Sequence, residues 1–153
     1  MPMKKTLLNQ NDKAEIFDRL RRLRPDSQRQ WGKMTAHQTI CHLSDSFMCK
    51  FGERESTQAS NFFTKTVMKW FALQAPFQWP HGVPTMPEND QLIGGTAPAE
   101  FERDRAQLEA TIERFCQPMK ELSPHPYFGQ MTEAEWLRWG YLHCDHHLRQ
   151  FGV

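Results

Sequence analysis

The sequence contains no long hydrophobic run, and nowhere do 18 apolar residues stand together. A membrane-spanning helix needs about 20 consecutive, mostly apolar residues. The N-terminus has Lys4 and Lys5, but only Leu7 and Leu8 follow them, which is too little for the apolar segment of a signal peptide. We therefore expect no membrane segment and no membrane partner.

Closely spaced cysteines are also missing. The sequence has four cysteines, none of them in a CxxC pair and not dense enough for a disulfide framework (Cys41, Cys49, Cys116 and Cys144). This excludes the common cysteine zinc sites, dithiol redox motifs and small disulfide scaffolds. We predict reduced thiols and a cytoplasmic protein.

The sequence also lacks an excess of positive or negative charge. Lysine and arginine number 19, aspartate and glutamate number 18, and the net charge is +1. Because nucleic-acid-binding domains usually concentrate positive charge, we expect no nucleic-acid partner. The basic run at 19–24 is interpreted as a solvated helix face. The length of 153 residues predicts a single domain over residues 1–153.

The alternation of period two that is typical of strands is nearly absent, and helix signals replace it. Asp12 is predicted to cap a first helix that extends to about Leu23. Thr35 and Gln38 form a capping box that begins a second helix, which is expected to extend to about Glu55.

Further helices are predicted in the second half of the chain. Asn61 is expected to cap a short third helix over residues 62–74, and a fourth is predicted from Pro98 to about Leu122. A capping box at Thr132 begins the last helix. Between the third and fourth helices lies a long loop over residues 75–98 that contains five prolines. The pattern predicts an all-α bundle with one long loop.

The last helix carries the most informative motif, His143 and His147 in the run YLHCDHHLRQFG. Side chains at positions i and i+4 of a helix lie on one face, about 5–6 Å apart at Cβ, so two imidazoles can bind one transition-metal ion. The glutamate of the HExxH metalloproteases is missing, because Cys144 follows His143 directly. The pattern excludes that class and requires a third ligand from elsewhere.

His42 is the favoured third ligand. It lies in the middle of the predicted second helix, among the apolar residues Ile40, Leu43 and Phe47. Facing helices of a bundle can project ligands into a shared core from such positions. His37 is five residues earlier, about 140° around the helix at 100° per residue, so it cannot face the same point.

Alternatives remain at each of these positions. His146 is the competitor of His143, although it points about 100° away from the next residue. The histidine pair would otherwise be a solvated C-terminal turn, where histidine also favours the helix dipole. His42 alone would be an ordinary buried histidine. Cys41 and Cys144 adjoin predicted ligands, but helix geometry turns them away, and they are interpreted as buried thiols.

Two segments resemble a known superfamily. MTAHQTICHL and HPYFGQMTEAEWLRWGYLHCDHHLRQFG are similar to the DinB/YfiT-like superfamily of metalloenzymes, in particular to one of its subfamilies of unknown function, over roughly residues 31–50 and 124–152. The resemblance implies a four-helix bundle of DinB/YfiT type, here with an extra short helix and a long proline-rich loop. It also implies a three-histidine metal site that matches His42, His143 and His147.

The resemblance implies a divalent-metal-dependent enzyme that acts on a small molecule, as a thiol-dependent S-transferase or as a hydrolase. The transferase would use a low-molecular-weight thiol as co-substrate. Three imidazoles leave a coordination position open and favour zinc or nickel, with iron and manganese as alternatives. The competing hypothesis is a non-catalytic module that binds a small ligand or a metal, and a third is a bundle that has lost its metal. No catalytic residue is identified.

Several neighbours are given supporting roles. Asp45 and Asp145 are expected to orient an imidazole, and Asp45 and Glu53 are the only candidates for an acid or base. Gly140, one turn before His143, is expected to leave space for an incoming ligand. His125 is expected either to stabilise a turn or to line the pocket mouth.

Two surfaces complete the predictions. The third helix carries several aromatic residues, which predict a homodimer (Phe62, Phe63, Trp70 and Phe71). The loop over residues 76–98 is longer than most connections, and such loops are usually functional or disordered. Phe77, Trp79 and His81 are expected either to cover the metal pocket as a lid or to seal one end of the bundle.

Overall fold

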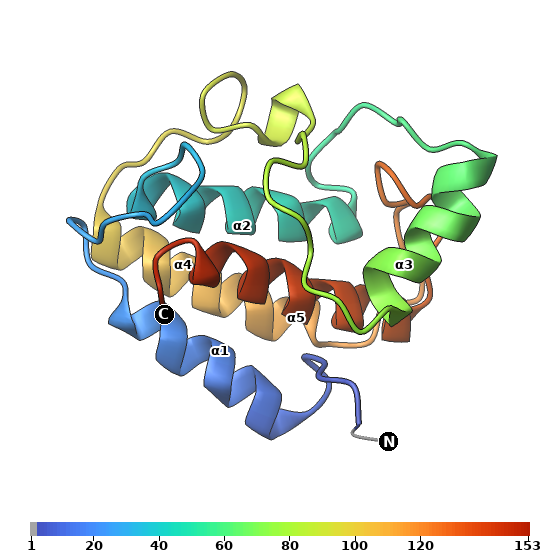
Figure 1. Ribbon diagram of the computed structural model, residues 1–153, viewed down its shortest axis with the longest axis horizontal. Helices are drawn as coiled ribbons and strands as arrows, with labels where there is room; N and C mark the ends of the chain where they lie inside the picture. The colour runs from blue at the N-terminus through green and yellow to red at the C-terminus, as the bar shows by residue number, and fades with distance from the viewer. Residues whose placement is uncertain (1–2) are drawn as a thin grey trace.

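The computed structural model describes residues 3–153, and the prediction of an all-helical protein is confirmed over this range (Figure 1). Its only strand-like pairing in that range is an isolated bridge between His125 and Gly129. None of the helices there has the length and apolar content needed to cross a membrane. The elements are α1 (Gln10–Arg22), α2 (Ala36–Phe51), the π-helix η1 (Thr64–Met68), α3 (Lys69–Gln74), the short 3-10 helix η2 (Pro87–Asn89), α4 (Phe101–Phe115) and α5 (Glu133–Arg149).

The last helix, α5, occupies the centre of the packing. It contacts α1, α2 and α3, while α2 packs most extensively against α4. Figure 1 shows α5 between α1 and α2, with the steeply inclined α3 at one end. The two helices that carry the predicted ligands, α2 and α5, are therefore direct neighbours.

The core is formed by apolar side chains that repeat at helical spacing on the long helices. α1 and α4 bury one stripe, as expected of amphipathic helices, whereas α2 and α5 are buried around most of their circumference. The fully buried members include Ile16, Leu20, Ile40, Leu43, Phe47, Leu108, Ile112, Phe115, Trp136 and Leu148. This interior fixes the rotation of α2 and α5 about their axes, and with it the direction of their histidines.

A buried lysine ties three helix ends together. Lys50, in the last turn of α2, is fully buried, and its Nζ donates to the carbonyl oxygen of Phe115 at 2.7 Å. The same Nζ lies 2.7 Å from a carboxylate oxygen of Glu133. Because a buried ammonium is costly unless it is paired and hydrogen-bonded, these contacts hold α2, α4 and α5 in register.

The capping residue predicted for α1 is wrong. Asn9, not Asp12, caps the helix, and its side chain accepts from the N–H groups of Asn11 and Asp12. Asp12 instead accepts from the N–H of Thr6 at 3.0 Å. Both capping boxes, at Thr35 and at Thr132, are confirmed. Whether a side chain caps a helix depends on where it lies in space. Sequence spacing alone could not choose between Asn9 and Asp12.

The predicted ends of α2 and α4 were too late. α2 ends at Phe51 rather than near Glu55, because Gly52 adopts a left-handed conformation with φ 69° and closes the helix. α4 is capped by Glu100 and ends at Phe115, well before Leu122. Pro118 follows three residues after that end, and its ring cannot continue the helix.

The third helical segment begins where predicted. Asn61 accepts from the N–H of Thr64 at 3.0 Å, and the helical run ends at Gln74. The segment is not one regular α-helix, since η1 has π-helical hydrogen bonding before α3 begins. The long loop over residues 75–98 is also confirmed, with η2 as its only helical turn.

Candidate metal centre

Three histidine side chains from α2 and α5 converge at one point in the interior. His143 Nε2 lies 3.2 Å from His42 Nε2 and 3.1 Å from His147 Nε2. All three residues are buried, and their potential ligand atoms lie within 4.8 Å of one another. The structure thus brings together the three residues that the sequence predicts as ligands.

In His42 and His147, the hydrogen bond of Nδ1 determines which ring nitrogen carries the proton. His42 Nδ1 lies 2.7 Å from the backbone carbonyl oxygen of Asn89, and His147 Nδ1 lies 2.8 Å from Gln150 Oε1. Each oxygen can only accept, so Nδ1 donates and the Nε2 of the same neutral ring carries a lone pair. Such contacts are the usual way in which proteins orient metal-binding imidazoles.

At most one hydrogen is then available for the two short contacts among the three Nε2 atoms. His143 Nε2 can donate at most one hydrogen, yet it faces the lone pairs of both His42 and His147. At least one of the two short contacts therefore sets lone pair against lone pair. A cation among the three nitrogens removes this repulsion, so the donor set fits a metal ion.

Burial also keeps these rings neutral. Desolvation lowers the pKa of His42, and it lowers the pKa of His143 and His147 well below the ordinary value for histidine. The positive charge that each of the other rings would carry lowers the pKa of His143 further. Neutral imidazole is the form that binds metals, so the ligands need lose no proton near neutral pH.

The carbonyl of Asn89 is held in place by a clasp around the long loop. Arg54, just beyond α2, donates to the carbonyl oxygens of Glu88 and Gly94 and to Asn89 Oδ1. Asp45 accepts from the backbone N–H of Thr96 at 2.8 Å. The clasp therefore joins residues 88–96 to α2 directly behind His42.

The predicted role of Asp45 in orienting an imidazole is therefore wrong. Its carboxylate accepts from Thr96 and Gln91 and lies 3.4 Å from Arg54 Nη1, with no contact to a histidine. It acts on His42 only through the loop that carries Asn89. Helix position could not distinguish these roles, because Gln91 and Thr96, the hydrogen-bond donors to the Asp45 carboxylate, lie 46 and 51 residues away in the sequence.

Three other supporting roles are also wrong. Asp145 pairs with Arg19 and Arg149 rather than with an imidazole. Glu53 forms an ion pair with Arg114 on the surface and does not line the cavity beside the histidines. Gly140 faces the core and leaves no space at the metal centre, since an added Cβ would lie within 3.0 Å of Leu7, Phe47 and Phe115.

The remaining histidines and the neighbouring cysteines lie outside the centre. His37 Nε2 lies 2.8 Å from Asp104 Oδ2, and His81 stacks on Trp31 with ring centroids 3.6 Å apart. His146 lines the cavity without joining the three converging nitrogens. Cys41 and Cys144 are buried free thiols, as predicted.

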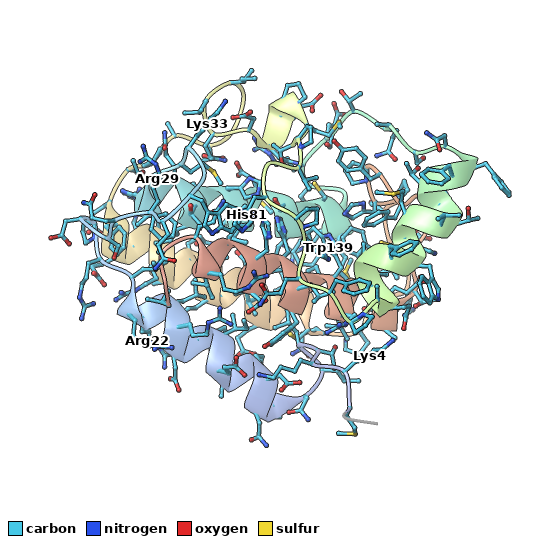
Figure 2. The ribbon with its side chains drawn as sticks, viewed as in Figure 1. Lys4, Arg22, Arg29, Lys33, His81 and Trp139 are labelled. Carbon is cyan, nitrogen blue, oxygen red and sulfur yellow. The ribbon has the colours of Figure 1, made fainter. Side chains whose placement is uncertain are left out.

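A cavity of about 460 Å³ opens beside His143 and His147. Its walls are mainly apolar and aromatic, and they come from α3, the long loop, the turn at residues 125–128 and α5. Trp139, labelled in Figure 2, contributes one wall, and its ring centroid lies 4.6 Å from that of His143. The volume falls within the range of small-molecule sites, about 300–1,000 Å³.

The long loop forms one side of this cavity. Phe77 and Trp79 line it, and the ring centroid of Trp79 lies 6.1 Å from that of His143. His81, which was expected to join them, stacks on Trp31 instead and does not line the cavity. The segment therefore lines the cavity beside the histidine centre with two of its three predicted side chains, a placement that both the lid and the end-seal hypotheses allow.

The sequence analysis did not predict the contacts of Gln150 and Asn89, and it left two alternatives for the role of His125. Gln150 lies three residues after His147, a spacing that places neighbours on one helix face and could have indicated it. The carbonyl of Asn89 gives no signal in the sequence. His125 performs both roles that were considered for it, since its Nδ1 accepts from two N–H groups of its own turn and the residue lines the cavity.

Comparison with known families places the chain. The family described as "Protein of unknown function (DUF1569)" matches residues 3–152. The chain belongs to this family. No curated protein and no solved structure matches the chain. The family match covers both helices of the histidine centre and the loop between them, but it carries no activity.

Proposed function

We propose that this DUF1569 protein binds one divalent transition-metal ion through His42, His143 and His147. The observation that carries the proposal is the convergence of three Nε2 atoms, two of which present lone pairs because their Nδ1 atoms donate to oxygens. Zinc or nickel suits three neutral imidazoles best, and iron and manganese are the alternatives.

We further propose that the ion makes the cavity an active site for a small molecule. Three protein ligands leave a coordination position open, which is typical of catalytic rather than structural zinc. When bound, the ion would supply Lewis acidity that lowers the pKa of a water or a thiol in the cavity. The resemblance to the DinB/YfiT-like superfamily supports thiol transfer, with hydrolysis as the alternative.

The chain's own residues contribute positioning and exclusion of water. Asn89 and Gln150 orient two of the rings, while Phe77 and Trp79 cover the side of the cavity. None of the cavity-lining residues in the described part of the chain is an aspartate or a glutamate. A proton acceptor in the cavity would therefore be an imidazole or the substrate itself.

The missing carboxylate favours one competing function. A module that binds a small ligand or a metal without turnover needs the cavity and the histidines but no acid or base. Turnover separates the two functions, because only an enzyme consumes substrate in a metal-dependent manner.

The bundle type, the assembly and the compartment also belong to this proposal. The contacts of α1, α2, α4 and α5 are compatible with the four-helix arrangement that the superfamily resemblance implies. Four free cysteines support a reducing, cytoplasmic environment. Exposed apolar residues of η1, α3 and the preceding turn support a homodimer, which light scattering at micromolar concentration would test (Phe62, Phe63, Val67, Met68, Trp70 and Phe71).

The direct test is metal analysis of protein purified without an affinity tag. We expect about one ion per chain in the wild type and in the control His81→Ala, and none in His147→Ala. Loss of the ion in the control, or its retention in His147→Ala, would contradict the assignment of ligands. The metal-loaded protein is then screened for thiol transfer and for hydrolysis, with His147→Ala as the inactive reference.

A further inference from the structure

The cavity beside the histidine centre is lined by uncharged side chains. Its lining has no lysine, arginine, aspartate or glutamate among the described residues. The rings and aliphatic groups of Phe71, Phe77, Trp79, Phe128 and Trp139 dominate instead. A charged group that leaves water for such surroundings without a partner loses several kcal/mol of solvation. The cavity therefore disfavours ligands that carry a charge into it.

Charged side chains of the protein lie on the other side of the cavity wall. A second hollow of about 330 Å³ contains Arg54 and Glu55, and it shares only Cys49 and Pro126 with the first. Arg54 is already committed to the carbonyl oxygens of the long loop. Neither of these charges lines the cavity, and Arg149, which donates to the lining residue Gln78 at 3.1 Å, is paired with Asp145.

Outside the histidine centre, two imidazoles of the cavity wall, His125 and His146, have unused hydrogen-bonding capacity, and at His125 the hydrogen can be assigned to one nitrogen. His125 Nδ1 accepts from the N–H groups of Tyr127 and Phe128 at 3.1 and 3.2 Å, so the hydrogen of the neutral ring lies on Nε2. Burial lowers the pKa of His125 to about 3, which keeps the ring neutral. No group in residues 3–153 accepts from this Nε2–H, and it is not sealed off from solvent.

Most of the other polar groups around the cavity are committed elsewhere. The indole N–H of Trp79 donates to the carbonyl oxygen of Ala72 at 2.8 Å, and the hydroxyl of Tyr127 donates to that of Pro84 at 3.0 Å. Small-molecule sites usually combine apolar walls with a few polar groups that set orientation. Of these two imidazoles, only His125 has its free hydrogen assigned to a definite atom, because the N–H groups of its own turn occupy Nδ1.

We propose that the cavity binds an uncharged, mainly apolar, ring-containing molecule. This molecule has an oxygen that accepts a hydrogen bond from His125 Nε2–H. The inference rests on the proposed function, because such a ligand would be the substrate presented to the histidine centre. A thiol co-substrate that carries charges would keep its charged ends outside the cavity.

The first test compares two probes that differ by one charge. N-phenyl-1-naphthylamine is uncharged, and 8-anilinonaphthalene-1-sulfonate has the same rings with a sulfonate. Both are titrated by fluorescence into the full chain, once with zinc and once after chelation. After chelation we expect the uncharged probe to bind at least about tenfold more tightly, since the metal-free cavity has no partner for the sulfonate. With zinc the preference should be smaller, because an ion with an open coordination position attracts the anion.

A matched pair of variants locates the probe. Thr85 lines the cavity at its exposed edge, whereas Leu92 is an exposed residue of the same loop that does not line it. Thr85→Arg should shift the preference towards the sulfonate by about tenfold, because the guanidinium provides a counter-charge. Leu92→Arg should leave the preference unchanged. An unchanged preference in Thr85→Arg, with loss of fluorescence in Phe62→Ser, would place the probe on the outer surface and overturn the proposal.

A second pair of ligands tests the hydrogen bond. 2-Acetylnaphthalene and 2-isopropylnaphthalene have nearly the same shape, but only the ketone has an accepting oxygen. We expect the ketone to displace N-phenyl-1-naphthylamine at a concentration about five- to tenfold lower, the usual worth of one hydrogen bond. Equal displacement would remove His125 from the proposal.

Failure of this inference is distinguishable from failure of the proposed function. One zinc per chain in the loaded protein, with equal binding of both fluorescent probes after chelation, would leave the metal centre intact and overturn the ligand class. Selective binding of the uncharged probe without any bound metal would support the ligand class and overturn the metal-dependent function.

Discussion

Two clusters on α2 bring metal-binding residue types together, and only one of them has the character of a metal centre. His42, His143 and His147 form the first cluster, and His37, Cys41 and Asp104 form the second. In both, the potential ligand atoms lie within 4.8 Å of one another. The difference between them is in how their hydrogens and lone pairs are used.

In the second cluster every polar group already has a suitable partner. Asp104 Oδ2 accepts from the N–H groups of Ala99 and Glu100 and lies 2.8 Å from His37 Nε2. Burial raises the pKa of the Cys41 thiol to about 11, so the sulfur stays protonated. The cluster fixes the start of α4 against α2, whereas the three-histidine cluster has lone pairs without hydrogens. Proximity of ligand types is thus weaker evidence for a metal than unsatisfied lone pairs.

The largest expected effect separates the two clusters by metal affinity. His42→Ala should lower the affinity for zinc by more than about 100-fold, because it removes one of three ligands. His37→Ala, five residues earlier on the same helix, should leave affinity unchanged within about twofold. Competition with a chromophoric chelator measures both. Comparable losses in the two variants would contradict the distinction between the clusters.

The clasp behind His42 should have the next largest effect. Arg54→Ala frees the loop carbonyls that Arg54 now holds, so Asn89 loses its fixed position against His42 Nδ1. We expect zinc affinity to fall about 10- to 100-fold, as for other partners of metal-binding histidines, while the stoichiometry stays at one. Glu53→Ala, which removes a surface ion pair one residue earlier, is the control. An unchanged affinity in Arg54→Ala would show that the clasp does not position the ring.

The two clusters should also respond to pH in different ranges. In the first cluster, burial lowers the pKa of His143 and of His147 well below the ordinary histidine value. Such rings stay neutral in the folded protein while the unfolded chain takes up protons below about pH 6.5. Stability of the metal-free protein should therefore be constant above that pH and fall below it, by up to about 1.4 kcal/mol per pH unit for each ring.

Asp104 should contribute only at lower pH. Burial alone would raise its pKa, but hydrogen bonds from Ala99, Glu100 and His37 outweigh burial, and the pKa is lowered. Its contribution to stability is present above the ordinary aspartate value of about 4 and is lost below it. Urea unfolding at pH 7, 5.5 and 4.5 measures the slope. His147→Ala should reduce it and Asp104→Asn should not; the reverse result would contradict the assignment.

The smallest expected effect concerns the stability of the second cluster itself. Asp104→Asn removes the charge from a side chain that caps the start of α4, and it should destabilise the fold by about 1 kcal/mol at pH 7. Metal content should stay at one ion per chain. Thermal unfolding with parallel metal analysis checks both quantities. Loss of the metal in this variant would mean that the clusters are coupled.

Local signals in the sequence predicted much of the fold. The capping boxes at Thr35 and Thr132 and the cap at Asn61 were identified because each depends on residues within one helical turn. The errors also have local causes. Asn9 competed with Asp12 as a cap three residues away, and Gly52 and Pro118 ended helices that apolar periodicity alone would have continued.

The sequence by itself determined the three candidate ligands, since helical spacing placed His143 and His147 on one face and the superfamily resemblance supported His42. Only the tertiary structure decided what surrounds them. The carbonyl of Asn89 lies 47 residues from His42 in the sequence, the clasp joins Arg54 to Glu88 across 34 residues, and the cavity wall combines several separate segments of the chain. A backbone carbonyl has no residue type to recognise, and a carboxylate such as that of Asp45 takes its role from whichever partner the packing brings within hydrogen-bond distance.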